Sequence, residues 1–382
     1  MAIGMVRRCL RLGLCVAAMG GCTSTPLLAP DLAAPPAMLV PAGAAGVVDF
    51  RARFREILCA VTPPDSTRTC QAMLHRLGGE AQPSGRPVWQ GPPRLPLRLA
   101  IVPGYGADCF AGLVTILGDA RAHLATIGWQ SIEVPVEGLS SSTRNAELIR
   151  NRVLAEPLAP GERLVLVGYS KGTADMLEAL ARYPEIRPHI AAAVSLAGTV
   201  AGSPLADNPP RLLPWLARNA PGSGCDEGDG RAFESLRRST RLAALASYSP
   251  SSSGVPMFSL GAFTARQDTS SILVPMHDRL SAMDPRNDSQ TLFTDQVIPG
   301  SVLLGYLNAD HWAVGLPLDQ ARPLLAALFT DRNAFPRPAM LEAVMRIVEE
   351  TLLDGSPSFS PPPSLAGRRR AGSELRWPSS RE

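Results

Sequence analysis

The sequence predicts an α/β fold with a mostly parallel central sheet and helices on both faces. Short apolar runs alternate with segments of helical periodicity through the middle of the chain, as in parallel sheets with helical crossovers. With 382 residues, 45% of them hydrophobic, the chain can bury a large core. The expected elements are strands at 97–103, 131–136, 163–168 and 191–196, with helices at about 109–127 and 143–155 between the first three.

The N-terminal 48 residues are predicted to direct export. Arg7, Arg8 and Arg11 precede an apolar run at 12–19 that is too short to span a bilayer, which is typical of a secretory signal over residues 1–21. Small residues then lead into Cys22, and this stretch resembles a bacterial lipobox with Cys22 as the lipidated first residue. Ordinary cleavage that leaves Cys22 as a plain thiol is the alternative.

Lipidation at Cys22 implies a protein anchored to a membrane by lipid. Thr23 after the cysteine, in place of aspartate, indicates the outer membrane, so we expect an exported protein of the periplasm or outer membrane of a Gram-negative bacterium. Residues 22–48, rich in Pro, Ala and Gly, are the expected tether. The formal net charge of +3 includes the three arginines of the signal, so the mature chain is near neutral, which argues against a nucleic-acid partner.

Residues 49–96 are predicted to form a small helical element, at 49–80, followed by a Pro/Gly linker. Cys59 and Cys70 flank a turn in this element, and outside the cytoplasm they are expected to form a disulfide. If Cys22 carries lipid, Cys109 and Cys225 remain as a second pair. Buried free thiols are the alternative. The Cys and His residues show no metal-ligand spacing, so no metal is expected.

The motif Gly168-Tyr169-Ser170-Lys171-Gly172 lies between a predicted strand and a predicted helix. Four apolar residues run into Gly168, and after Gly172 apolar residues recur at helical spacing. A sharp turn of this kind holds the serine in a strained conformation with its Oγ exposed, while the flanking glycines let strand and helix approach. The helix N-terminus also favours developing negative charge. Ser170 is therefore the candidate nucleophile.

Together with His311 and the block at 194–207, this motif resembles bacterial lipases and esterases of the α/β-hydrolase superfamily. The resemblance covers about residues 97–335. It implies an α/β-hydrolase fold, with the domain over 97–354, and triad residues in the chain order serine, acid, histidine.

Residues 203–250 interrupt the alternation of strands and helices and are rich in Pro, Gly, Ser and Arg. In lipase-like folds this segment often forms a cap. Its apolar cluster around Trp215 is expected either to line an acyl pocket or to pack this excursion against the rest of the domain. A second excursion covers 264–283, and the Ser-, Pro- and Arg-rich residues 355–382 are predicted to be disordered.

Histidine supplies the general base that a serine nucleophile needs. Of the five histidines, only His311 follows the last predicted strand, at 301–307, so it is the expected base. His277 lies on the second excursion and is the other histidine that could approach the site. His75, His123 and His189 are expected to be structural or exposed.

A carboxylate orients such a histidine and stabilises its charged form. Asp288 lies in a stretch that resembles the acid loop of lipases, and Asp284 is its main rival. Asp310 adjoins His311 along the chain, and Asp295 lies too near the last strand. We expect the remaining carboxylates to cap turns or face solvent.

The loop after the first strand supplies one oxyanion donor in the hydrolase fold. We expect this donor to be the backbone N–H of Tyr105, with that of Lys171 as the second. Pro103-Gly104 replaces the usual His-Gly, so ordinary turn glycines are the alternative. The side chain of Lys171 is expected at the surface, at the helix start.

These residues predict a serine hydrolase that cleaves carboxylic esters, either small molecules or lipids, through an acyl-enzyme and without a cofactor. Two other classes remain open. One is an inactive hydrolase-fold binding lipoprotein, and the other is an acyltransferase or thioesterase that shares the acyl-enzyme.

Overall fold

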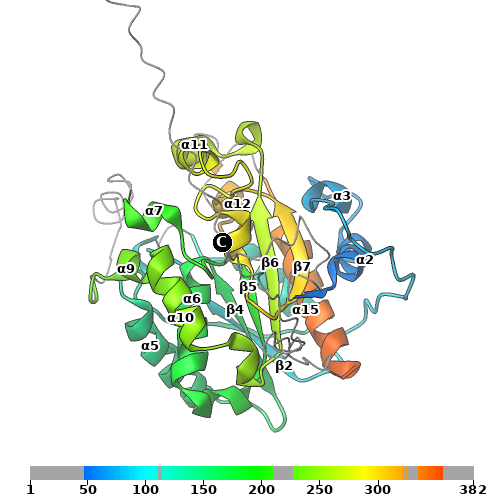
Figure 1. The fold of residues 1–382 in the computed structure, drawn as a ribbon. Helices are drawn as coiled ribbons and strands as arrows, with labels where there is room; N and C mark the ends of the chain where they lie inside the picture. The colour runs from blue at the N-terminus through cyan, green and yellow to red at the C-terminus, as the bar shows by residue number, and fades with distance from the viewer. Residues whose placement is uncertain (1–46, 111–113, 210–226, 322, 325–333, 356–382) are drawn as a thin grey trace, which may run out of the picture.

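The centre of the computed structural model, which describes residues 47–110, 114–209, 227–321, 323–324 and 334–355, is a seven-stranded sheet (Figure 1). Its strand order is β1-β7-β6-β5-β4-β2-β3, and every pairing between these strands is parallel. This confirms the predicted α/β fold. The strands are β1 (Val48–Asp49), β2 (Leu97–Val102), β3 (Ser131–Glu133), β4 (Arg163–Tyr169), β5 (Ile190–Leu196), β6 (Met257–Phe263) and β7 (Val302–Asn308).

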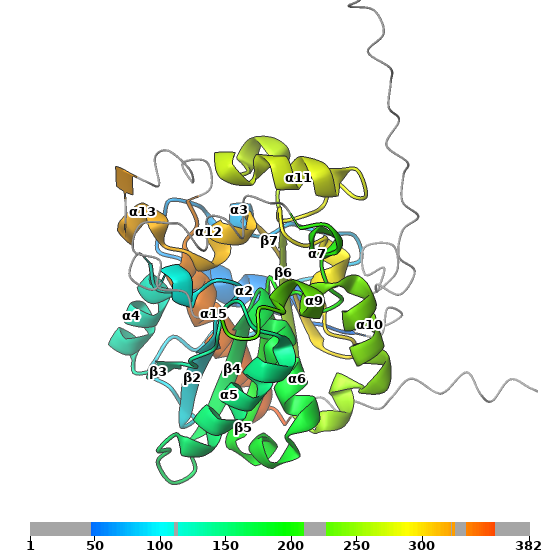
Figure 2. The same ribbon diagram turned by 90° about the vertical axis from the view of Figure 1, so that its left-hand side faces the viewer.

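Helices cover both faces of the sheet (Figures 1 and 2). On one face lie α2 (Arg51–Val61), α4 (Gly118–Ile127) and α15 (Arg337–Leu353), which pack with the strands into the larger hydrophobic core. On the other face lie α5 (Ser142–Ala155) and α6 (Lys171–Arg182), with a second core beneath them. Because both faces are covered, the central strands β5 and β6 are buried along their whole length.

Helix α4 begins nine residues later than the sequence predicted, at Gly118 instead of 109. The residue before it, Leu117, has a φ of 53°, in the left-handed region, so a right-handed helix cannot continue through it. The short turn Asp108–Phe110 takes the place of the missing first helical turns, and 111–113 lie outside the described residues.

The N-terminal element adds an edge strand that the sequence analysis missed. Val48, the last residue of the predicted tether, and Asp49, the first residue of the predicted helical element, form β1 and pair with Val302 and Leu303 of β7. A two-residue strand is too short to show periodicity in a sequence. The predicted disulfide is confirmed: Cys59 of α2 is bonded to Cys70 of α3 (Cys70–Met73), with 4.9 Å between their Cα atoms.

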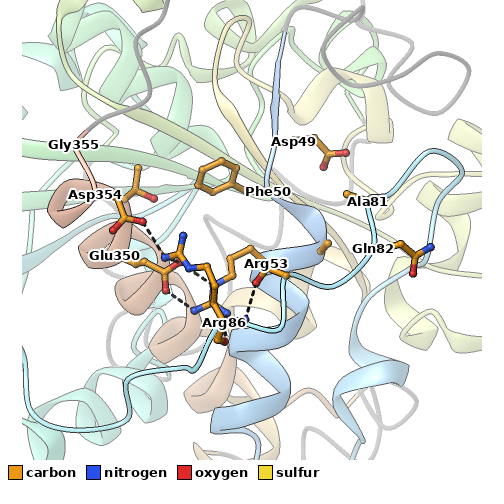
Figure 3. A pocket seen from close by; sticks show the side chains of 12 residues that line it. Asp49, Phe50, Arg53, Ala81, Gln82, Arg86, Glu350, Asp354 and Gly355 are labelled. Atoms are coloured by element: carbon orange, nitrogen blue, oxygen red, sulfur yellow. Dashed lines mark hydrogen bonds and ion pairs between the residues drawn. The ribbon is translucent and has the colours of Figure 1, made fainter.

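Ion pairs fasten this element to the C-terminal helix α15. Arg53 donates to Glu350 at 2.7 Å and to Glu56 at 2.9 Å, while Arg86 donates to Glu350 and to Asp354. Arg53, Arg86, Glu350 and Asp354 line a hollow of about 320 Å³ between the start of α2, residues 81–86 and the end of α15, shown from close by in Figure 3. Both of its arginines are bonded to carboxylates of α15 or of the residue after it, and these ion pairs join α2 and residue 86 to the C-terminal helix.

The second predicted excursion and the first part of the first one lie toward the end of the sheet where the strands finish, whereas the later part of the first runs beside α6 (Figures 1 and 2). The first contains α7 (Pro204–Asp207), α9 (Ala232–Leu236) and α10 (Arg238–Ser247), and the second contains α11 (Val274–Ser281). Side chains from both meet in one apolar cluster, formed by Leu205, Leu273, Met276, Leu280 and Leu292 with Trp312 packed against it. Residues 210–226, with the apolar cluster around Trp215, lie outside the described part.

The predicted signal, Cys22, most of the tether and residues 356–382 also lie outside the described part. No helix in the described ranges is both long enough and apolar enough to cross a membrane. Within those ranges, no group of three or more His, Cys, Asp or Glu side chains is arranged to hold a metal ion.

Candidate active site

Ser170, Asp288 and His311 meet at the edge of the sheet where the strands end. Ser170 comes directly after β4, Asp288 lies in the connection between β6 and β7, and His311 begins α12 (His311–Gly315) just beyond β7. Since the strands are parallel, their carboxyl ends share one edge. The parallel sheet thus brings together side chains that are up to 141 residues apart in sequence.

The turn at Ser170 has the strained geometry that the motif predicts. Ser170 has a φ of 58° and a ψ of −127°, a combination that non-glycine residues rarely adopt. A Cβ at Gly168 would lie 2.6 Å from Cα of Thr173, and one at Gly172 would overlap the backbone oxygen of Val102. The flanking glycines therefore let helix α6 start against β4 and β2, with the Ser170 side chain partly exposed.

A continuous hydrogen-bonded chain joins the three side chains. Ser170 Oγ lies 2.7 Å from His311 Nε2, and His311 Nδ1 lies 2.7 Å from Asp288 Oδ2. A carboxylate can only accept, so Nδ1 carries the proton and donates to Asp288, and Nε2 is left to accept from Ser170. Asp288 is fully buried and His311 is 4% exposed, so the pair works in a medium of low dielectric constant.

The carboxylate of Asp288 is held from its other side by the turn that follows it. Its Oδ1 accepts the backbone N–H groups of Gln290, at 2.9 Å, and of Thr291, at 2.7 Å. Ser289 enters this turn with a φ of 81°. Because both N–H groups bind Oδ1, Oδ2 is free to face the imidazole.

Two further residues support His311, and the sequence analysis assigned neither of them this role. The hydroxyl of Tyr169 donates to the backbone oxygen of His311 at 2.6 Å, and burial raises the pKa of Tyr169 well above its ordinary value. Asp310 caps α12 through the N–H of Ala313 and also accepts the N–H of Ser270. Burial raises the pKa of Asp310. Tyr169 lies inside the motif, but no local pattern shows where its hydroxyl points.

The rival side chains have other partners. Asp284 pairs with Arg286 two residues on, at 2.8 Å, and Asp295 pairs with Arg238 at 3.1 Å. The ring of His277 lies between the backbone oxygen of Thr264 and the hydroxyl of Ser281. His75 contacts the backbone oxygen of Phe263, and His123 contacts Glu342.

The loop after β2 passes directly beside the serine. A Cβ at Gly104 would lie 2.8 Å from Cβ of Ser170 and 3.2 Å from its Oγ. The next residue is Tyr105, the expected first oxyanion donor, and Lys171 is the first residue of α6, where backbone N–H groups have no partner within the helix. Gly104, the residue before Tyr105, therefore lies beside Ser170, and Lys171 directly follows Ser170 in the chain.

The expectation that the Lys171 side chain lies at the surface is wrong. Lys171 is 1% exposed, and its Nζ donates to both oxygens of Asp175, at 2.9 and 2.7 Å. Helix α5 packs against α6 and contributes Asn145, which also bonds Asp175. Lys171 is therefore enclosed together with Asp175, although it is the first residue of α6.

Cys109 follows the loop after β2 and is disulfide-bonded, while its expected partner Cys225 lies outside the described residues.

A hollow of about 400 Å³ lies beside the loop after β2. Tyr105, Leu139 and Phe233 form an apolar part of its wall, and Asp229 contributes a carboxylate.

Comparisons with known proteins find similar solved structures. No family model matches the sequence, and no curated protein matches it. The crystal structure of the metagenomic carboxyl esterase MGS0156 is similar, with 40% sequence identity, a TM-score of 0.75, and coverage of 83% of this chain and 97% of that one.

Two lipase structures show weaker similarity. The mature lipase BlEst2 of Bacillus licheniformis has 18% identity and a TM-score of 0.48, with coverage of 60% of this chain and 89% of that one. The lipase of Staphylococcus hyicus has 12% identity and a TM-score of 0.46, with coverage of 70% of this chain and 100% of that one.

Proposed function

Because this chain belongs to the α/β-hydrolase family of esterases and lipases that includes the metagenomic carboxyl esterase, we propose that it is a serine hydrolase that cleaves carboxylic esters through an acyl-enzyme. The observation that carries the proposal is the hydrogen-bonded chain from Ser170 through His311 to Asp288, with 2.7 Å at each step. The strained turn at Ser170 and the burial of the other two residues support it.

In the first half of the reaction, Ser170 Oγ attacks the ester carbonyl carbon and passes its proton to Nε2 of His311. The positive charge that forms on the imidazole is stabilised by Asp288, which also keeps the ring in the correct tautomer. When the tetrahedral intermediate collapses, the C–O bond to the alcohol breaks and His311 returns the proton to the departing oxygen. The acyl group remains on Ser170.

In the second half, His311 takes a proton from a water molecule, whose oxygen attacks the acyl carbon. The carboxylic acid leaves and the proton returns to Ser170 Oγ. In both halves, the backbone N–H groups of Tyr105 and Lys171 donate to the carbonyl oxygen as it becomes negative. The close approach of Gly104, the residue before Tyr105, to Ser170 and the place of Lys171 at the start of α6 support this assignment.

The hollow beside Tyr105 is a suitable place for one arm of the ester. Its wall includes the rings of Tyr105 and Phe233, whose centroids lie 4.9 Å apart, and the side chain of Leu139. Apolar walls of this kind bind uncharged acyl or alcohol groups. The carboxylate of Asp229 disfavours an anionic substituent there.

Export and lipid anchoring at Cys22 are also part of the proposal. They are supported by the sequence before Cys22 and by the Cys59–Cys70 disulfide, which suits an oxidising compartment. Radiolabelled palmitate should label the wild-type chain in a Gram-negative host and should not label Cys22→Ala. Cys15→Ala, a change within the predicted signal, is the matched control and should keep the label.

The decisive test of the enzyme proposal is labelling with a fluorophosphonate probe together with hydrolysis of p-nitrophenyl esters of graded chain length. Wild type should react with both, and Ser170→Ala and His311→Ala should react with neither. Ser247→Ala, at an exposed serine of α10, should behave as wild type. A folded wild type that takes no label and cleaves no ester, with or without detergent, would contradict the proposal. Transfer of the acyl group to an added alcohol in preference to water would indicate an acyltransferase.

A further inference from the structure

Lys171 directly follows the nucleophile Ser170 in the chain, and its buried ammonium group is not used in the reaction described above. Lys171 is the only lysine in a chain with 37 lysines and arginines. Its Nζ bonds both carboxylate oxygens of Asp175, one helical turn further along α6, and both side chains are 1% exposed. Burying an ion pair is costly, and apolar residues of similar volume often give equal stability. Stability alone therefore does not account for this pair.

The pair continues into a hydrogen-bonded network that leaves helix α6. Asn145 of α5 donates from Nδ2 to Asp175 Oδ2 at 2.8 Å. The side-chain amide of Asn145 also makes two hydrogen bonds to the backbone of Glu137. Its Nδ2 donates to the Glu137 oxygen and its Oδ1 accepts the Glu137 N–H, each at 3.0 Å. Asn145 and Asp175 are both fully buried, so water does not compete for these bonds.

The backbone that Asn145 holds is in turn bonded to the loop beside Ser170. The oxygen of Gly138 accepts the N–H of Gly106 at 3.2 Å, and the N–H of Gly138 donates to Asp108 Oδ1 at 3.1 Å. A Cβ at Gly138 would lie 2.6 Å from the Gly106 nitrogen, so the two segments are in direct contact. A chain of contacts thus runs from the start of α6 back to residues 104–108.

We propose that Lys171, Asp175 and Asn145 are positioning residues that fix residues 104–108 relative to the start of α6. The inference rests on the proposed function, in which one oxyanion donor lies on each of these two segments. Such donors must lie about 2.7–3.1 Å from the developing oxyanion. An error of about 1 Å in such a site reduces the rate by roughly a hundredfold.

The choice of lysine fits this role. Of the 37 lysines and arginines, all except Lys171 are arginines, whose planar guanidinium is larger than an ammonium and carries its donors in a rigid fork. The compact ammonium of Lys171 meets both oxygens of one carboxylate inside a closed space. We therefore expect Lys171→Arg to have a low kcat, as Lys171→Met does.

The test compares Lys171→Met and Asn145→Leu with Arg346→Met. Arg346 forms the matched control pair, a buried ion pair with Glu342 at the same i,i+4 spacing on α15. Lys171→Met and Asn145→Leu should lower kcat for a p-nitrophenyl ester roughly ten- to hundredfold with little change in KM. Binding of a boronic acid that mimics the tetrahedral intermediate should weaken by the same factor. Arg346→Met should lower Tm and leave kcat unchanged.

In Lys171→Met, the carboxylate of Asp175 stays buried without its ammonium partner. The double variant Lys171→Met/Asp175→Leu removes this carboxylate as well. Its Tm should recover toward that of wild type while kcat stays low. A kcat that recovers together with Tm would mean that the pair acts only through stability and would overturn the inference.

Amide hydrogen exchange of residues 104–108 tests the coupling without any reference to activity. Exchange should be faster in Lys171→Met and Asn145→Leu than in wild type, and unchanged in Arg346→Met. If wild type cleaves no ester but exchange rises, the proposed function fails while the coupling stands. If exchange in 104–108 is unchanged, the positioning inference fails even when wild type is active.

Discussion

Asp288 and His311 are joined twice. The carboxylate of Asp288 accepts from Nδ1 of His311 at 2.7 Å, and the backbone oxygen of Asp288 accepts the backbone N–H of His311 at 2.8 Å. The second bond ties the acid turn to the first residue of α12, so the ring and the carboxylate cannot drift apart independently. Both bonds are buried and keep their geometry without help from solvent.

This double connection predicts a sharp difference between two neighbouring aspartates. Asp288→Asn keeps the shape of the turn but removes the charge that stabilises the imidazolium, so kcat should fall about 10³- to 10⁴-fold. Asp284→Asn, which affects only the pair with Arg286, should keep kcat near the wild-type value. Initial rates on one ester, with circular dichroism as the folding control, test both. Equal losses in the two variants would refute Asp288 as the acid.

The contact between Gly104 and Ser170 predicts that a single methyl group is enough to disturb the site. In Gly104→Ala the new Cβ would press on the Ser170 side chain, so the nucleophile or the loop must move. We expect a loss of about a hundredfold in kcat. Gly78→Ala is the matched control, since a Cβ there meets nothing within 4 Å. If Gly104→Ala retains full activity, the loop does not sit where the oxyanion assignment needs it.

The Cys59–Cys70 disulfide predicts a change in stability that is separate from catalysis. The cysteines are 11 residues apart in sequence, and a bond closing a loop of about that length contributes roughly 3 kcal/mol. Cys59→Ala/Cys70→Ala should therefore lower the free energy of unfolding by about this amount in urea. Its kcat at low temperature should change little, because neither cysteine touches the three site residues. A large loss of kcat with unchanged stability would contradict this.

The buried ring of His75 is expected to make the free energy of unfolding fall at low pH. Its ring stacks on Phe263, with centroids 3.7 Å apart, and burial lowers its pKa from the ordinary 6.5. The folded state thus favours neutral His75, so this contribution to stability is complete above the ordinary pKa and is lost as the pH falls through the lowered value. His75→Phe keeps the stack and should flatten the decline of the free energy of unfolding below pH 6.5. Urea unfolding across pH 5–7.5 measures this, and an unchanged slope would contradict it.

The sequence predicts those parts of the fold that local patterns encode. The apolar run before Gly168 and the helical spacing after Gly172 indicate the strand and helix on either side of Ser170, and chain order directs attention to His311. The choice between Asp284 and Asp288 depends on how one turn is folded, with Ser289 at positive φ, and no periodicity shows that.

Other features depend on contacts between distant segments. Lys171 is buried together with its partner Asp175, which Asn145 of α5 also bonds, and a pattern read along α6 alone places Lys171 at the surface. The first residues of the predicted helix at 109–127 are not helical, because Leu117 turns the backbone into the left-handed region. Strand β1 exists only through its pairing with β7. In each case the missing information lies in the partner segment.

The enclosure of the only lysine also determines how the protein reacts with amine-directed reagents. In the folded state, an N-hydroxysuccinimide ester finds no accessible lysine ε-amino group, and unfolding releases a single one. The number of acylated lysines per chain therefore reports directly on whether the start of α6 has opened. Covalent immobilisation through surface lysines is not available for this molecule, so attachment chemistry must use its carboxylates, arginines or an introduced cysteine.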